Sequence, residues 1–308
     1  MQIGQLLNMM PGAAAQGLIW GVMAIGVYIT YRILDIADLT VDGSIATGGC
    51  VATVLIVAGV NPWVAMLCAF LAGMLAGLVT GVFHTLMGIP AILAGILTQL
   101  AQYSIDLRIL GNRANVPVSA RKYPVVISLS NVLQATLNNP ILLLAIITAV
   151  LIAVIYWFFG TEYGCGLRAV GANQQMARSQ GINTSFGKVI GLMLSNGIVA
   201  FSGALLSQYQ GFADVQMGRG AIVIGLAAVI IGEVVFGKLF RNFGLKLLAV
   251  SLGAIIYYLV IQLVLWLGLN TNDLKMLTAL VVAVFLAVPH WKARLAANAV
   301  KKGDKGNA

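Results

Sequence analysis

Residues 63–87 read WVAMLCAFLAGMLAGLVTGVFHTLM, a stretch of 25 residues that contains no Asp, Glu, Lys or Arg. Because about 20 apolar residues in helical form cross a hydrocarbon core of about 30 Å, this stretch predicts a transmembrane helix. Gly73, Gly77 and Gly81 repeat every four residues on one face of that helix, a spacing that favours close contact with a second helix. The spacing leaves open whether the second helix belongs to this chain or to another copy.

Eight further apolar runs bring the expected number of membrane segments to about nine. Their continuity argues against a β-barrel, whose strands alternate apolar and polar residues. The sequence therefore predicts an all-α polytopic membrane protein in which one segment, 44–58, is short or discontinuous. The eight runs are 12–34, 44–58, 90–110, 140–160, 186–208, 218–235, 244–268 and 274–288.

The composition argues against most other classes of protein. Of 308 residues, 60% are hydrophobic and 9% are charged, which is too apolar for soluble domains. A net charge of +9 would suggest nucleic acid as a partner of a soluble protein, but these cations lie in short segments between apolar runs. We therefore expect membrane lipid as the surroundings and no nucleic acid as a partner. Cys50, Cys68 and Cys165 have no C-x-x-C spacing, so we expect no redox role for them.

The distribution of Lys and Arg predicts the orientation in the membrane. Alternate loops place twelve cations on the side of the C-terminus and six on the other side, and the richer side is expected to be cytoplasmic. The cluster from Arg113 to Lys122 opposes this rule. The first twelve residues contain no Lys or Arg, so no cleaved signal peptide is expected. We predict an external N-terminus, a single transmembrane domain over 1–290 and a basic cytoplasmic tail over 291–308.

Two loops are long enough to carry structure of their own. In the outer loop, 111–139, the apolar spacing of SNVLQATL at 130–137 predicts a short surface helix. In the inner loop, 161–185, the stretch ANQQMARSQ predicts a short cytoplasmic helix with Asn173 as its N-terminal cap.

Polar side chains on 90–110 are the first candidates for a solute path. Gln99, Gln102 and Asp106 fall on one helix face, and Thr98 lies beside them. Polar groups at membrane depth are costly and usually face a water-filled path or the interior of a helix bundle. For the two glutamines, lining a path and bonding a neighbouring helix remain equally open.

Two further groups of polar residues are candidates for the same path. Ser195 and Asn196 lie within an apolar run, where bonding to a neighbouring helix is the favoured interpretation for the serine. Asp38, Thr40 and Asp42 precede the short run, and an acidic segment at that place suggests a discontinuous helix. A solvated cytoplasmic turn is the plainer interpretation, and Asp38 and Asp42 could still be caps for the helix that follows.

The motifs of catalysis and metal binding are incomplete. GEVVFGKL at 232–239 nearly fits the nucleotide-binding G-x-x-x-x-G-K-[ST], but Leu239 replaces the hydroxyl residue that binds Mg²⁺. Ser202 has no nearby histidine base, since His84 and His290 are expected at the ends of spans. We therefore predict no catalytic residues, no metal ligands and no cofactor in this chain.

Four stretches carry a family resemblance. The segment GLRAVGANQQMARSQGINTSFGKVIGLMLSNGIVAFSGALLSQYQGF at 166–212 is followed by AAVIIGEVVFGK at 227–238. IADLTVDGS at 36–44 and IPAILAGILT at 89–98 precede them. Together they resemble the permease subunits of bacterial ABC importers of the branched-chain amino acid and ribose type. Relatives often have glycine where Glu233 stands here, so no role is transferred to that position.

The resemblance implies a type II-like permease bundle in the bacterial plasma membrane that imports a small polar solute, such as an amino acid. It also implies a second permease copy, two cytoplasmic ATPase subunits that bind ATP and Mg²⁺, and an external solute-binding protein. A short cytoplasmic helix of such permeases docks on the ATPase. The matching coupling residues here are Ala172, Asn173, Gln174, Gln175, Met176, Ala177, Arg178, Ser179, Gln180, Gly181 and Ile182.

An ion-coupled secondary transporter is the chief alternative. In that case Asp106, or Asp38 together with Asp42, would carry the cation or proton.

Overall fold

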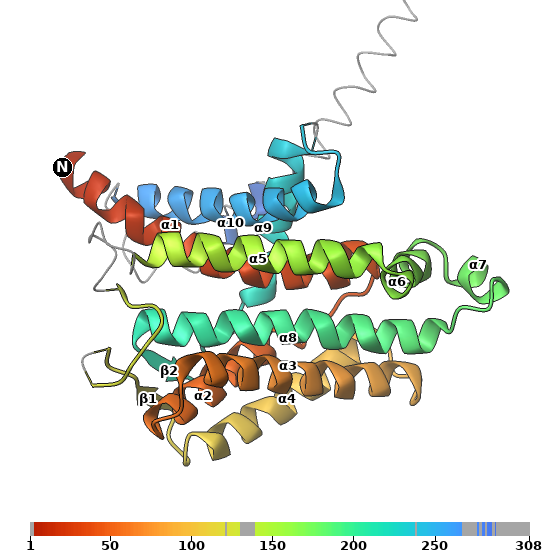
Figure 1. Cartoon of the computed structure of the whole chain (residues 1–308), viewed down its shortest axis with the longest axis horizontal. Helices are drawn as coiled ribbons and strands as arrows, with labels where there is room; N and C mark the ends of the chain where they lie inside the picture. Colours follow the sequence, from red (N-terminus) through yellow and green to blue (C-terminus); the bar gives the residue numbers. More distant parts are fainter. Residues whose placement is uncertain are drawn as a thin grey trace, which may run out of the picture.

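The computed structural model describes residues 3–120, 122–129, 139–237 and 239–266, together with 276, 279–280, 282–284 and 287. Helices account for nearly all of the regular structure (Figure 1). In chain order they are α1 (Ile3–Tyr28), the π-helical turn η1 (Ile29–Ile33), α2 (Val41–Val57), α3 (Pro62–Thr85), α4 (Ala91–Ile109), α5 (Pro140–Gly160), α6 (Glu162–Ala172), α7 (Gln174–Ser179), α8 (Thr184–Gln210), α9 (Ala221–Phe236) and α10 (Phe243–Trp266).

Among the described residues, five helical segments are long and apolar enough to cross a membrane. Two more apolar helices, α2 and α9, are shorter. The expected count of nine membrane segments is therefore not confirmed, and the predicted run 274–288 lies mostly outside the described residues, as do the surface helix at 130–137 and the basic tail at 291–308. The five long segments are Met9–Ile33, Pro62–Thr85, Pro140–Gly160, Thr184–Gln210 and Phe243–Trp266.

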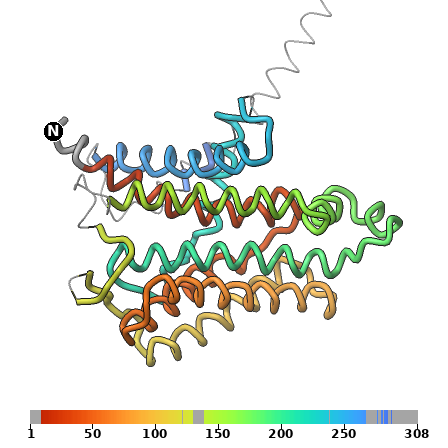
Figure 2. The backbone as a smooth tube through the Cα atoms, viewed as in Figure 1, coloured from red at the N-terminus to blue at the C-terminus, as the bar shows by residue number. Residues whose placement is uncertain are grey.

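The expected discontinuity lies between η1 and α2. Residues 34–40 are not helical, and Asp35 adopts a φ of 55°, a left-handed conformation that helps the chain reverse direction. Figure 2 shows the chain turning back from the end of α1 toward the start of α2. The structure begins α2 at Val41, three residues before the predicted start. The first turn of α2 consequently lies inside the bundle, with nearly all of its residues buried.

Glycines allow the backbones of the long helices to lie close together. A Cβ on Gly73 or Gly77 would collide with the backbone of α8, and one on Gly17 or Gly21 would collide with α10. The predicted glycine face of α3, and a second one on α1, therefore contact helices of this same chain. Such small residues allow backbones to approach where lipid supplies no hydrophobic drive between helices.

Two short strands modify the predicted all-α fold. β1 (Asn115–Pro117) and β2 (Phe212–Asp214) pair in antiparallel register, with Val116 opposite Ala213. They join the loop after α4 to the segment after α8, so this end of the bundle is called the β end below. α6 and α7 project from the opposite end, the α7 end (Figure 1). The predicted inner loop thus contains two helices, of which only the second was expected.

Candidate functional site

A buried polar network begins at Asp38, in the nonhelical segment before α2. Asp38 is 2% exposed and Asn196 of α8 is completely buried. One carboxylate oxygen, Oδ1, accepts a hydrogen bond from the Thr40 backbone N–H at 2.9 Å. The other, Oδ2, accepts from Asn196 Nδ2 at 2.7 Å. The discontinuous segment is therefore fastened to the middle of α8 by a carboxylate and an amide.

The network continues from Asn196 toward the β end. Ser44 Oγ donates to Asn196 Oδ1 at 2.6 Å. On α4, Gln102 Nε2 lies 3.4 Å from Ser44 Oγ and 3.2 Å from Thr47 Oγ1. Thr47 Oγ1 in turn donates to Asp106 Oδ2 at 3.2 Å. A continuous chain of polar side chains thus links two buried carboxyl groups through α2, α4 and α8.

Three threonines form a branch of this network. The hydroxyls of Thr40 and Thr80 lie 2.7 Å apart, and Thr80 Oγ1 donates to Thr98 Oγ1 at 2.9 Å. The branch joins α3 and α4 to the nonhelical segment, and all three side chains are buried.

The second aspartate of the acidic segment has a different partner. Asp42 Oδ2 accepts from the Gly220 N–H at 3.0 Å, and Oδ1 accepts from the Ile222 N–H at 2.9 Å. Asp42 therefore caps the N-terminus of α9, where backbone N–H groups favour a carboxylate. The interpretation of Asp42 as a cap for its own helix is wrong, because Asp42 lies within the first turn of α2. Asp38 and Asp42 consequently do not form a carboxylate pair.

Two further candidates for the solute path, Ser195 and Gln99, lie outside this hydrogen-bond network. Ser195 donates to the Gly26 carbonyl of α1 at 2.8 Å, which is the helix-bonding role that was favoured for it. Gln99 is half-buried and lines a cavity between α2 and α4. The sequence interpretation missed Ser44, Thr47 and Thr80. Two of them lie three residues apart in the short run, a helical spacing that would have indicated a polar face.

The α7 end carries the predicted coupling helix. Asn173 caps α7 as expected, with its Oδ1 accepting from the N–H groups of Gln175 and Met176 at 3.0 Å each. Arg178 Nε donates to Thr184 Oγ1 at 2.9 Å, and Ala177 is buried. The helix therefore lies on a stable turn at the start of α8.

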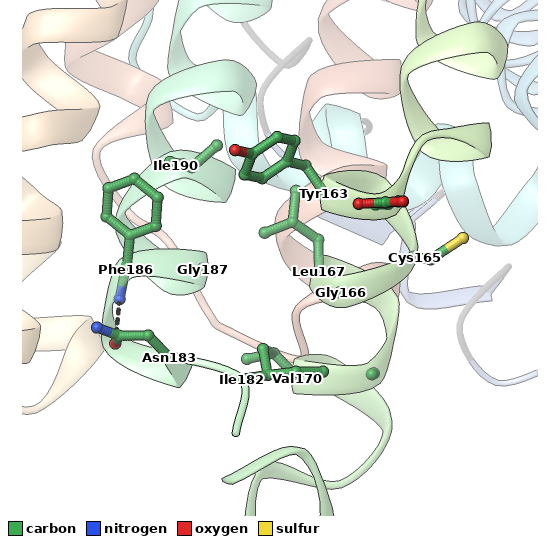
Figure 3. A pocket seen from close by; sticks show the side chains of 12 residues that line it. Tyr163, Cys165, Gly166, Leu167, Val170, Ile182, Asn183, Phe186, Gly187 and Ile190 are labelled. Carbon is green, nitrogen blue, oxygen red and sulfur yellow. Dashed lines mark hydrogen bonds between the residues drawn. The ribbon is translucent and has the colours of Figure 1, made fainter. Parts of the chain in front are cut away.

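A cavity of about 720 Å³ lies beside this helix (Figure 3). It separates α6 from the start of α8, and its wall includes Leu167, Val170 and Ile190. Tyr163 and Phe186 lie on opposite sides of it and are 73% and 57% exposed. The α7 end thus presents an apolar hollow next to an exposed polar helix.

Buried polar side chains around a discontinuous helical segment are typical of membrane transport proteins. Among the described residues, no group of three or more His, Cys, Asp or Glu could hold a metal ion. The fold and the network together define the class of a multi-pass transport permease.

Comparisons with known proteins identify the family. Residues 9–289 match the family described as the branched-chain amino acid transport system permease component, and the chain belongs to that family. It is therefore an ABC transporter permease, a transport subunit that spans the membrane. Glu233, to which the resemblance assigned no role, pairs with Arg32 at 3.1 Å.

Two relatives are similar along most of their length. A protein of Clostridioides difficile named as a tyrosine transport system permease protein is 41% identical over 88% of this chain and 88% of its own. An uncharacterized protein of Rickettsia prowazekii is 31% identical over 91% of this chain and 98% of its own. One solved structure, described as an inward-facing conformation of an ABC transporter of the metal-chelate type, has a TM-score of 0.49 at 14% identity, covering 95% of this chain and 90% of that one.

Proposed function

We propose that this chain is the permease subunit of an ATP-driven importer that takes up an amino acid or a closely related polar solute. The family match over residues 9–289 carries this proposal. The relative named for tyrosine transport supports an amino acid as the solute. Import is inferred from the family resemblance, and an external binding protein would deliver the solute.

The complex would contain a second permease copy and two cytoplasmic ATPase subunits, which would bind the ATP and Mg²⁺. α7 is suited to contact an ATPase, because it is short, capped and exposed along most of its length. The apolar cavity beside it would receive an apolar side chain of the same partner. ATP-driven movement at this end would reach the network through α8, since Asn196 and α7 are connected by that helix.

The solute path would run beside the buried network. A bundle that alternates between two states needs contacts that differ between those states. The Thr80 hydroxyl of α3 links Thr40 in the nonhelical segment to Thr98 of α4. Gln102 of α4 donates to Ser44 of α2. Because these bonds connect separate helices, they can exchange partners when the helices move.

Reconstituted uptake would test this function. The permease, its ATPase and its binding protein are placed in proteoliposomes, and entry of radiolabelled L-tyrosine and L-leucine is measured with and without ATP. We expect at least one of the two solutes to be taken up, and this uptake should require ATP. Uptake driven by a sodium or proton gradient without the ATPase would select the ion-coupled secondary transporter instead.

Acidic residues on the exposed side of α7 are expected to uncouple ATP hydrolysis from transport. Met176 is 62% exposed, and Gln175 beside it is also exposed. Replacing both with glutamate should reduce uptake roughly tenfold or more, because unpaired charges would be desolvated against the ATPase. The melting temperature should stay unchanged, because neither side chain is buried.

The matched control keeps the first side chain polar and uncharged and the second apolar, with Gln175→Asn and Met176→Leu. This control should transport normally. Normal uptake by the acidic variant as well would remove α7 from the coupling mechanism.

The proposed orientation places the β end outside the cell and α7 inside. The positive-inside rule supports it, as does the gathering of Arg32, Arg168, Arg241 and Lys246 around one cavity near α6. In a chain with Cys165 replaced by serine, a cysteine at Ala114 should react with an impermeant maleimide in intact cells. A cysteine at Ser179 should react only after lysis. The reverse pattern would invert the proposed orientation.

A further inference from the structure

A second cavity lies within the membrane bundle, toward the β end. It has a volume of about 350 Å³ and is bordered by α2, α4 and the segment between β2 and α9, which is within the range of about 300–1,000 Å³ found for small-molecule sites. Gly43, Gln99, Tyr103, Asp106 and Arg219 are among its lining residues. This space is called the α4 cavity below.

Two buried acceptor atoms lack a hydrogen-bond partner, one on Asp106 in the wall of the α4 cavity and one on Gln102, which lies against Gly43 of that wall. Within the described part of the chain, Gln102 Oε1 and Asp106 Oδ1 accept no hydrogen bond. Gln102 is 4% exposed and Asp106 is 1% exposed. The unpaired Gln102 oxygen lies directly against Gly43, where a Cβ would collide with it. Since buried polar atoms in native proteins are normally paired, two unpaired acceptors one helical turn apart indicate a missing donor.

The two acceptors specify the chemistry of that donor. Each is an oxygen with free lone pairs and no proton to give, when the carboxyl group is ionised. A primary ammonium group carries three N–H donors and a positive charge, so it can bond to the carboxylate and the amide oxygen together. The other oxygen of Asp106 is already satisfied by Thr47, which keeps the carboxylate aimed in one direction.

The α4 cavity also contains a charge of the opposite sign. Arg219 is exposed and lines the same space as Asp106. Among the described residues, the ion pair found is between Arg32 and Glu233, so Arg219 does not neutralise Asp42 or Asp106 directly. A guanidinium group offers paired donors that match a carboxylate. A solute between Arg219 and Asp106 would therefore meet a cationic and an anionic group.

Part of the cavity wall is apolar, although Asp42 and Gln99 also line it. Leu100, Tyr103 and Val215 border the cavity, and the ring of Tyr103 is 43% exposed. Such a wall suits an aromatic or large aliphatic group better than a polar one.

We propose that the α4 cavity binds a neutral amino acid with an apolar or aromatic side chain. The α-ammonium group lies at Asp106 Oδ1 and Gln102 Oε1, the α-carboxylate lies at Arg219, and the side chain lies against Tyr103. This inference rests on the proposed function, whose solute it defines. Both acceptor oxygens are covered in this conformation, so the ammonium reaches them when the contact between α2 and α4 opens, as expected of an alternating pathway.

Equilibrium binding to the full chain in lipid nanodiscs tests the proposal. Radiolabelled L-phenylalanine is the probe, and two competitors each lack one charged group. Phenethylamine has no carboxylate, and 3-phenylpropionate has no ammonium. With the wild-type chain, L-phenylalanine should compete roughly tenfold or more better than either analogue, because each analogue leaves a charged group unpaired.

Two variants should change this preference in opposite ways. In Arg219→Gln, phenethylamine should compete as well as L-phenylalanine, because the partner of the carboxylate is gone. In Asp106→Asn, 3-phenylpropionate should gain on L-phenylalanine by a similar factor. Arg108→Gln is the control. Arg108 is an exposed cation of α4, the helix that carries Asp106, but it does not line the cavity. This variant should bind like the wild type.

Several outcomes would overturn the proposal. They are no measurable binding of L-phenylalanine, equal competition by all three compounds in the wild type, or the same preference in both variants. Binding of ²²Na⁺ that is lost in Asp106→Asn, without binding of L-phenylalanine, would assign the two oxygens to a metal cation instead. The proposed function fails separately, through uptake that does not require ATP.

Discussion

Replacing Asn196 with leucine is expected to destabilise the chain strongly. Leucine has a similar volume, but it removes the donor at 2.7 Å from Asp38 Oδ2 and the acceptor at 2.6 Å from Ser44 Oγ. Removing one partner of a buried hydrogen bond leaves the other partner unsatisfied, which costs about 1–3 kcal/mol and more when that partner is a carboxylate. We expect a clear drop in the melting temperature of the purified protein and a low yield of folded protein.

Ser195→Ala is the matched control, because Ser195 is adjacent and equally buried. It removes a neutral hydrogen bond to the Gly26 carbonyl, and such interhelical bonds contribute about 0.6 kcal/mol on average. The control should therefore melt close to the wild type.

A double-mutant cycle separates this contact from general packing. If Asp38 is also replaced with leucine, no buried carboxylate remains without its amide partner. Replacing both partners of a buried bond with apolar groups can be nearly neutral, so the double variant should be more stable than Asn196→Leu alone. The proposed contact between Asp38 and Asn196 would be contradicted if the double variant lost as much stability as the two single variants together.

A second large effect is expected from a single added methyl group at Gly48. This glycine is buried in α2, and a Cβ there would overlap the carbonyl oxygen, carbonyl carbon and Cα of Ala200 in α8. Backbone atoms cannot move aside as a flexible side chain can. Gly48→Ala should therefore separate α2 from α8 and destabilise the chain by about 1–3 kcal/mol, the usual cost of overpacking.

Gly166→Ala provides the comparison, because nothing lies within 4 Å of a Cβ built at that position of α6. Alanine is favoured over glycine inside a helix by about 0.5–1 kcal/mol, so this variant should be unchanged or slightly more stable. Thermal unfolding of both variants measures the difference. Equal melting temperatures would show that the α2–α8 contact tolerates displacement.

Gly48→Ala should also reduce transport, because it disturbs the contact between α2 and α8. α2 holds Ser44 and Thr47 against Asn196 and Gln102, so a displaced α2 breaks the network even if the chain remains folded. Reduced uptake by any Gly48→Ala protein that survives purification is the expected result.

Several features could be predicted because their physical cause is local. Continuous apolar runs identified the long helices, since a span is defined by its own hydropathy. Asn173 was identified as a cap because the preference for asparagine at a helix start depends on the next three backbone N–H groups. The acidic segment ahead of the short run indicated a discontinuous helix for the same reason, although α2 begins earlier than its apolar run suggested.

Other features depended on partners far away in the chain. Asp42 caps α9 across 180 residues, and nothing in its own helix indicates that destination. β1 forms only because the segment after α8 pairs with it. α6 was missed because its glycines weaken a helical pattern, whereas Leu167 and Val170 of the folded helix pack near Gly187 of α8.

The residues themselves thus defined a helical membrane permease of a recognisable family, with polar groups at membrane depth. Tertiary structure alone decided which of those groups meet. Gln99 and Gln102 share a helix face in sequence, yet one borders a cavity and the other is buried in the network. The physical reason is that helical periodicity is set by neighbours within one turn, whereas the contact of Asp38 with Asn196 joins residues 158 positions apart. Only the folded packing of α2, α4 and α8 brings such residues together.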